Sequence, residues 1–272
     1  PMSREQYSYQ QLKQWLSEPG WHLALLPVGC YEQHGPELPL DTDILESAEL
    51  ARRLAERVAQ SGLGRAYCLP GLNYTLTEPN KGFAGTVSVP GDCLRPYLEA
   101  VLRGILATAY TSVVVVNGHG SVDPILKEVA FKLVLEQFES RTRPVRPILC
   151  LNVFDVWNQV EERFGQAPGR HADWAELLMT YALLGPDYYD SSRLQRLEEF
   201  STSHDFSVRF PRVLGIPAQL RSVDGVQGEP WPRSSRPFQE QAHEYWAFVE
   251  QHCFEVLCSE LTRFHDEFAA SP

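Results

Sequence analysis

The stretch from residue 25 to residue 43 reads LLPVGCYEQHGPELPLDTD and joins a short apolar run to a polar loop. The apolar run is short enough for a buried strand, and Gly29 interrupts it. The glycine and the prolines that follow exclude a regular helix in the loop. Glu32, His34 and Asp43 therefore lie within, or just after, a loop at the carboxyl end of a predicted strand. Open α/β sheets build their binding sites at that end of the strands.

A second predicted strand ends in a similar way. SVVVV at residues 112–116 is the clearest buried parallel strand, and it is followed by NGHGS, which contains His119. Taken alone, each of these polar side chains has an ordinary explanation, such as a loop acid, a helix cap or a turn histidine. Together, imidazoles and carboxylates at the ends of two strands form a ligand set that suits zinc, manganese or iron. The sequence therefore predicts a metal site.

Strands and helices alternate along the chain, which predicts an α/β fold with a mainly parallel sheet and helices on both faces. Further strands are expected at residues 66–70 and 147–153. Helices are expected at residues 9–17, 44–61, 92–109, 123–139, 171–184, 193–200 and 238–268. The glycines, prolines and asparagines between residues 71 and 90 predict a long loop that passes near the site. With 272 residues and no linker or repeat, we expect one domain over residues 1–272.

The composition excludes several classes of partner. A formal net charge of -11 argues against a nucleic-acid surface or an anionic membrane as partner. No apolar run approaches the ~20 residues that span a bilayer, and the first residues are polar, so we expect a cytoplasmic protein. The six cysteines, Cys30 among them, form no CxxC pair, and those in apolar runs are interpreted as small core residues.

The loop at residues 25–43 closely resembles the opening motif of the creatininase (creatinine amidohydrolase) family. The matching residues are Leu26-Pro27-Val28-Gly29, Glu32-Gln33-His34-Gly35-Pro36, Leu38-Pro39 and Thr42-Asp43. Later segments resemble family motifs in the same order, namely FAGT at residues 83–86, VNGHG at 116–120, His171-Ala172 with Glu176, and GVQGEP at 225–230. The resemblance covers most of the chain and implies a three-layer αβα sandwich.

The resemblance also implies a site that holds two divalent metal ions, which would be zinc, manganese or iron. Carried over by position, Glu32 and His119 resemble ligands of one metal and His34 a ligand of the other. Asp43 would bridge the two metals. Glu176 would complete the second metal, although an ordinary exposed helix residue is an equally good interpretation of that position.

The implied reaction is hydrolysis of an amide by a metal-activated water. His171 is the expected proton donor to the leaving nitrogen, because the ordinary pKa of histidine lies near the working range. Glu176 is the second expected catalytic residue. Trp174, which lies inside a motif, Ser121 and Glu78 are the expected substrate-binding residues.

Several positions depart from the family pattern. Ser121 stands where creatinine-hydrolysing members carry an acidic ligand, and Pro79 follows Glu78 where a histidine is common. Asp173-Trp174 replaces a frequent Gly-Glu. Metal-binding positions are kept while substrate-facing positions change, which argues against creatinine as the substrate.

We therefore expect a metal-dependent amidohydrolase that cleaves a non-peptide C–N bond, a cyclic amide or formamide, in a small molecule. One alternative is a peptidase that trims a short precursor peptide, as a creatininase-like enzyme does in mycofactocin maturation. Another is a non-catalytic metal-binding subunit. Family members commonly form homo-oligomers, often hexamers, and the resemblance implies the same here.

Overall fold

Within residues 8–141, 144–213 and 215–268, which the computed structural model describes, four strands form one parallel sheet. The order across the sheet is β2 (Gly64–Cys68), β1 (Trp21–Val28), β3 (Ser112–Asn117) and β4 (Ile148–Asn152). The two central strands, β1 and β3, are buried almost throughout, as expected of parallel strands with helices on both faces. Their carboxyl ends therefore lie side by side.

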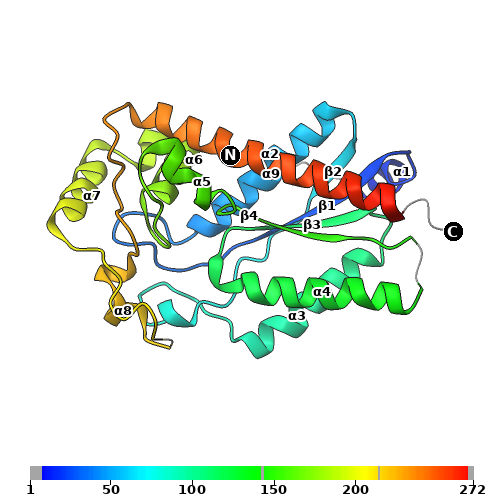
Figure 1. The fold of residues 1–272 in the computed structure, drawn as a ribbon, viewed down its shortest axis with the longest axis horizontal. Coiled ribbons are helices and arrows are strands. Elements are labelled where there is room, and N and C mark those ends of the chain that lie inside the picture. The colour runs from blue at the N-terminus through cyan, green and yellow to red at the C-terminus, as the bar shows by residue number, and fades with distance from the viewer. Residues whose placement is uncertain (1–7, 142–143, 214, 269–272) are drawn as a thin grey trace.

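Helices cover both faces of the sheet, as Figure 1 shows. One face carries α2 (Thr42–Ser61), α5 (Trp157–Phe164), α6 (Trp174–Tyr188) and the long α9 (Phe238–Phe268). The other face carries α3 (Gly91–Leu106) and α4 (Asp123–Glu139). Apolar side chains of α1 (Tyr9–Trp15), and Leu16 directly after it, pack against the core on this face. The predicted three-layer αβα sandwich is confirmed. No helix of the described residues is long and apolar enough to cross a membrane.

Alternate side chains of the central strands build two separate cores. Leu23 and Leu25 of β1 pack toward α2 and α9, whereas Ala24 and Leu26 pack toward α3 and α4. Full burial of each such leucine contributes about 1.5–3 kcal/mol to folding. The remaining helices, α7 (Ser191–Ser203) and α8 (Ala218–Arg221), lie beyond the carboxyl ends of the strands, at the left of Figure 1.

The predicted elements agree with the structure where periodicity is strong. The bounds of α4 and α9 are those expected, and β1, predicted as a strand over residues 21–28, also has the expected bounds. β2 begins two residues earlier than predicted because Gly64 pairs with Trp21 at the start of β1. α3 ends at Leu106, before the predicted end at residue 109. α5 was not predicted.

The helix predicted from residue 171 begins instead at Trp174. The Asp173 side chain caps it by accepting hydrogen bonds from the backbone N–H groups of Ala175 and Glu176. His171 lies before this cap, in an isolated antiparallel bridge with Gln227. This bridge holds His171 in the loop between α5 and α6.

Two glycines let the amino terminus of α2 lie against the strand ends. A Cβ atom on Gly29 would lie 2.6 Å from the backbone nitrogen of Ile44, and one on Gly118 would lie 2.3 Å from the backbone oxygen of Asp43. Both distances are shorter than any side chain tolerates. The absence of side chains at these positions therefore brings Asp43 to the edge where β1 and β3 end.

Candidate metal centre

Five predicted site residues converge at the carboxyl edge of the sheet. Glu32 and His34 come from the loop after β1, and His119 follows β3. Asp43 lies in the first turn of α2, and Glu176 lies in the first turn of α6. Except for Glu176, which is half-buried, these side chains are buried.

Asp43 faces both strand-end histidines. Its Oδ1 atom lies 3.1 Å from Nε2 of His34, and its Oδ2 atom lies 2.9 Å from Nδ1 of His119. One carboxylate thus presents a separate oxygen to each imidazole. This is the geometry that a carboxylate adopts when it bridges two cations.

Glu32 is held by one oxygen and presents the other to the cluster. Its Oε2 atom accepts hydrogen bonds from the Thr77 hydroxyl and, at 2.8 Å, from the Asn80 amide. Its Oε1 atom lies 3.2 Å from Nδ1 of His119 and has no hydrogen-bond partner among the described residues. Thr77 and Asn80 belong to the segment at residues 71–90, so the prediction that this loop passes near the site is confirmed.

Each strand-end histidine is oriented by a backbone carbonyl. The Nε2–H group of His119 donates to the Leu76 carbonyl at 2.9 Å, and the Nδ1–H group of His34 donates to the Glu32 carbonyl at 3.1 Å. The other nitrogen of each ring is left to face Asp43. Hydrogen bonds of this kind set the ring orientation of metal-binding histidines.

The electrostatics of the cluster favour cations. Burial alone would lower the pKa of His34, but the Asp43 carboxylate raises it to about 10. Burial opposes ionisation of Glu32, yet His119 and then His171 hold the pKa of that carboxyl well below its usual range. The buried carboxylates thus stabilise positive charge at His34 and His119. Asp43 Oδ2, like Glu32 Oε1, has no hydrogen-bond partner within the described part of the chain, so the residues present fit divalent metal ions.

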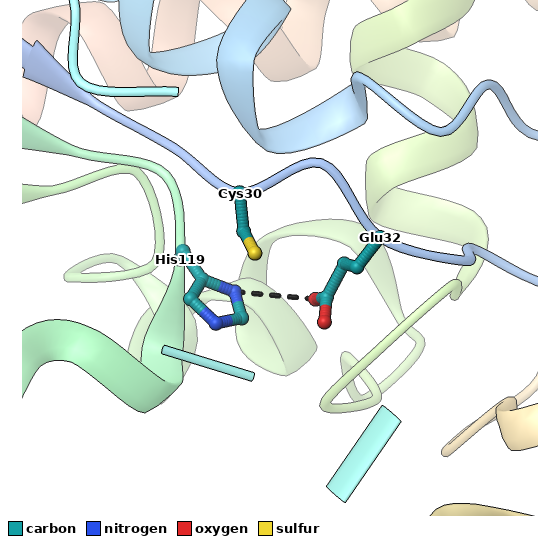
Figure 2. Close-up of side chains that lie close together, drawn as sticks. All are labelled: Cys30, Glu32 and His119. Carbon is teal, nitrogen blue, oxygen red and sulfur yellow. Dashed lines mark ion pairs between the residues drawn. The ribbon is translucent and has the colours of Figure 1, made fainter. Parts of the chain in front are cut away.

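Three groups of side chains in the described ranges bring one ligand atom each within 4.8 Å of one another. They are His34 with Asp43 and Glu176, Glu32 with His34 and His171, and Cys30 with Glu32 and His119. The last group is drawn in Figure 2, where the three side chains point toward one another. Sequence reasoning placed Cys30 in the core only. The position of Cys30 at a strand end, between Gly29 and Glu32, is the sequence feature that could have placed it in the cluster.

His171 and Glu176 lie on the α6 side of the cluster. The His171 ring lies 4.4 Å from the His34 ring, and its Nε2–H group donates to the Gln33 carbonyl at 2.7 Å. Burial, reinforced by His34, lowers the pKa of His171 to about 4. The Glu176 carboxylate accepts from the Ala172 backbone N–H, and burial raises the pKa of Glu176 to about 8. Glu176 faces the cluster and is not an exposed helix residue.

The expected substrate-binding residues fall in different places. Trp174 is 2% exposed, and its indole N–H donates to the Ala167 carbonyl inside the core formed by α5, α6 and α9. This packing supports a structural role for Trp174. Ser121 is exposed in the short turn directly after His119. Glu78 is exposed and pairs with Lys81 at 2.5 Å.

Comparison with known proteins relates this geometry to a family. The family model named Creatininase, described as creatinine amidohydrolase, matches residues 5–251. The chain belongs to the creatininase family. Members of this family are hydrolases.

Curated relatives of this creatininase-family protein differ in their activities. It is 37% identical over 120 residues to the mycofactocin precursor peptide peptidase of Mycolicibacterium smegmatis, a match covering 44% of this chain and 47% of that protein. It is 31% identical over 102 residues to the creatinine amidohydrolase of Pseudomonas putida, covering 36% of this chain and 37% of that protein. The chain thus matches less than half the length of either relative.

Solved structures share the whole fold. A creatininase variant in complex with creatine has a TM-score of 0.73 at 20% identity, covering 93% of this chain and 96% of that chain. Other solved creatininases include a manganese form and a zinc–zinc form. At this identity the likeness establishes the fold.

Proposed function

We propose that this creatininase-family hydrolase is a metal-dependent amidohydrolase that cleaves a non-peptide C–N bond, in a cyclic amide or formamide, of a small molecule. The position of Asp43 between His34 and His119 carries the proposal. A buried carboxylate with one oxygen toward each histidine supports a centre of two cations, and such centres hydrolyse amides.

The side chains divide into two metal positions. Glu32 and His119, with one oxygen of Asp43, would hold the first ion. His34 and Glu176, with the other oxygen of Asp43, would hold the second, and the grouping of these three side chains supports this assignment. Nitrogen and oxygen ligands of this kind suit zinc, manganese or iron. The manganese and zinc forms of related creatininases are consistent with these metals.

Bound divalent ions would supply a water of lowered pKa and polarise the substrate carbonyl. The chain itself must then move a proton to the leaving nitrogen. His171 is placed for this task, because its Nε2–H group is engaged with the Gln33 carbonyl and its Nδ1 atom lies 3.6 Å from Oε1 of Glu32. With a pKa of about 4, the ring is neutral near neutral pH. His171 would therefore first accept a proton of the attacking water at Nδ1 and then deliver it to the leaving nitrogen.

Burial of the cluster favours a compact reacting group. The exposed fractions of His34, His119 and His171 are 0%, 5% and 7%. A small amide reaches such atoms more readily than the middle of an extended chain does. The second candidate function, trimming of a short precursor peptide, is favoured by the identity to the mycofactocin precursor peptide peptidase. The same chemistry would serve both, because both reactions break an amide C–N bond.

Metal analysis and a substrate panel test the proposal together. Protein purified without chelators is expected to contain close to two divalent ions per chain and to hydrolyse members of a panel of lactams and formamides. Hydrolysis of short peptides without hydrolysis of lactams or formamides would instead support the peptidase function. Two ions without turnover on any amide would leave a non-catalytic metal-binding subunit, and no bound ion after metal is supplied would overturn the metal centre itself.

Assembly and compartment stay predictions. The family resemblance implies a homo-oligomer, such as a hexamer, and a cytoplasmic location is proposed with it. Light scattering of the purified protein measures the first of these directly.

A further inference from the structure

The proposed function leaves Cys30 unused, although its side chain lies in the cluster. Cys30 follows the end of β1 and is fully buried. In Figure 2 its sulfur points into the space between the His119 ring and the Glu32 carboxylate. Among the described residues, the thiol makes one weak hydrogen bond, to the Thr75 carbonyl at 3.9 Å. The sulfur lone pairs are therefore available to a ligand.

Both neighbours present a potential ligand atom toward the same space. The Glu32 carboxylate is fully buried, and its Oε1 atom has no hydrogen-bond partner in the residues that the structure describes. His119 is anchored through Nε2 on the Leu76 carbonyl, so that Nδ1 faces Glu32. A sulfur, an oxygen and a nitrogen thus converge, with a ligand atom from each residue within 4.8 Å of the others.

We propose that Cys30 is a thiolate ligand of the metal ion held by Glu32 and His119. The inference rests on the proposed function, because it requires the same metal centre. When the sulfur–metal bond forms, the S–H bond breaks and its proton passes to solvent, so neither an oxidant nor a reductant is needed. Bond lengths of about 2.3 Å to sulfur and about 2.0 Å to nitrogen place tetrahedral ligand atoms roughly 3.5 Å apart. The 3.2 Å between Oε1 of Glu32 and Nδ1 of His119 is close to this spacing.

A thiolate makes the two metal positions chemically different. The position of Cys30, Glu32 and His119 carries a soft sulfur ligand, which favours zinc or cobalt over manganese. The position of His34 and Glu176 carries nitrogen and oxygen only and accepts manganese readily. The first position is therefore expected to keep zinc when manganese is supplied in excess.

Cobalt substitution tests the proposed sulfur–metal bond by spectroscopy, without a measurement of activity. Metal-free protein is loaded with Co²⁺, and the wild type is expected to show a near-ultraviolet sulfur-to-cobalt charge-transfer band besides the weaker visible bands. Cys30→Ser should lose the near-ultraviolet band and keep visible bands from the second position. Cys150→Ser, which changes a half-buried thiol on β4, should keep both. Cys30→Ala, checked by circular dichroism, replaces the serine variant if a hydroxyl disturbs the buried pocket.

Metal affinities give a second readout. Cys30→Ser is expected to weaken zinc binding at the first position by at least about tenfold and to change manganese binding little. Cobalt bound to the wild type without a charge-transfer band would overturn the thiolate ligand and leave the proposed function standing. Failure of the wild type to bind cobalt, zinc or manganese would overturn the proposed function itself.

Discussion

The Nδ1 atom of His119 lies 2.9 Å from the Oδ2 atom of Asp43, although the two residues come from different elements. His119 follows the central strand β3, and Asp43 lies in the first turn of α2. The contact exists because the backbone at Gly118 approaches that of Asp43 more closely than any side chain would allow. The site is therefore built into the packing of α2 against the sheet.

Asp43→Asn should abolish the metal centre. The amide keeps the shape of the side chain but removes the charge that would balance two cations, so metal content should fall from about two ions to below one per chain. Hydrolysis should fall on the order of 10³-fold, which corresponds to the loss of several kcal/mol of stabilisation by the metals. Elemental analysis and turnover measure both effects. Asp41→Asn is the control, since Asp41 makes no side-chain capping bond to α2; normal metal content in Asp43→Asn would contradict the bridge.

Glu176→Gln should weaken the second metal position selectively. The amide oxygen can still accept from the Ala172 N–H, so the local fold should persist while the ligand charge is lost. We expect about one ion per chain after gel filtration of Glu176→Gln and about two for the exposed control Glu198→Gln. Two tightly bound ions in both variants would show that Glu176 is not a ligand.

Thr77→Val should lower metal affinity without changing any ligand. The Thr77 hydroxyl donates to Oε2 of Glu32 and thereby orients the other oxygen toward His119. Loss of such a supporting hydrogen bond typically costs about 10–100-fold in metal affinity. Titration with zinc in a competing chelator measures the change. The control is Thr108→Val, because the Thr108 hydroxyl donates to the Ile105 carbonyl at the far end of α3. This variant should bind zinc as the wild type does.

Gly118→Ala should destabilise the fold, because its Cβ would lie 2.3 Å from the Asp43 backbone oxygen. Overpacking of this kind costs about 1–3 kcal/mol of unfolding free energy. Gly104→Ala in α3 is the matched control, since a Cβ there meets nothing within 4 Å. That change should stabilise the protein by about 0.5–1 kcal/mol, the helix preference of alanine over glycine. Urea unfolding of both variants tests the contrast, and equal effects would refute it.

Glu46→Gln should stabilise the metal-free protein increasingly as pH rises. Glu46 is fully buried, and neither carboxylate oxygen has a hydrogen-bond partner in the described portion of the chain. Burial, together with Glu176 and Asp43, raises the pKa of Glu46 well above its usual value. A carboxyl with a raised pKa in the folded state costs stability once pH exceeds its ordinary pKa. The gain from Glu46→Gln should therefore be larger at about pH 8 than at about pH 5.

Glu49→Gln on the same helix should behave in the opposite way. Burial opposes ionisation of Glu49, but hydrogen bonds from Arg52 and the nearby Arg53 lower its pKa. Its contribution is present above the ordinary carboxyl pKa and is lost as pH falls through the lowered value. Glu49→Gln should therefore cost more stability at about pH 8 than at about pH 4. Unfolding midpoints across this range check both variants, and parallel trends would contradict the assignment for Glu46.

Local pattern was sufficient for much of the fold and for most of the proposed ligands. The apolar run that ends at Gly29 predicted β1, and the valine run predicted β3, because burial on both faces selects continuous apolar residues. Glu32, His34, Asp43 and His119 could be found because they lie in, or just after, the polar loops that end such runs. The family motifs added Glu176, which lies in the first turn of α6.

Other features depend on residues that are far apart in the sequence. The position of Cys30 beside Glu32 and His119, the burial of Trp174 and the low pKa of His171 all follow from packing between separate elements. The same is true of Asp43, whose two oxygens face different histidines only because β1, β3 and α2 meet at one edge. Periodicity reports which residues are apolar along one segment, but desolvation and ion pairing depend on neighbours that other segments supply. Sequence alone therefore identified most of the side chains that could bind metal, and the tertiary structure was needed to show which atoms face one another.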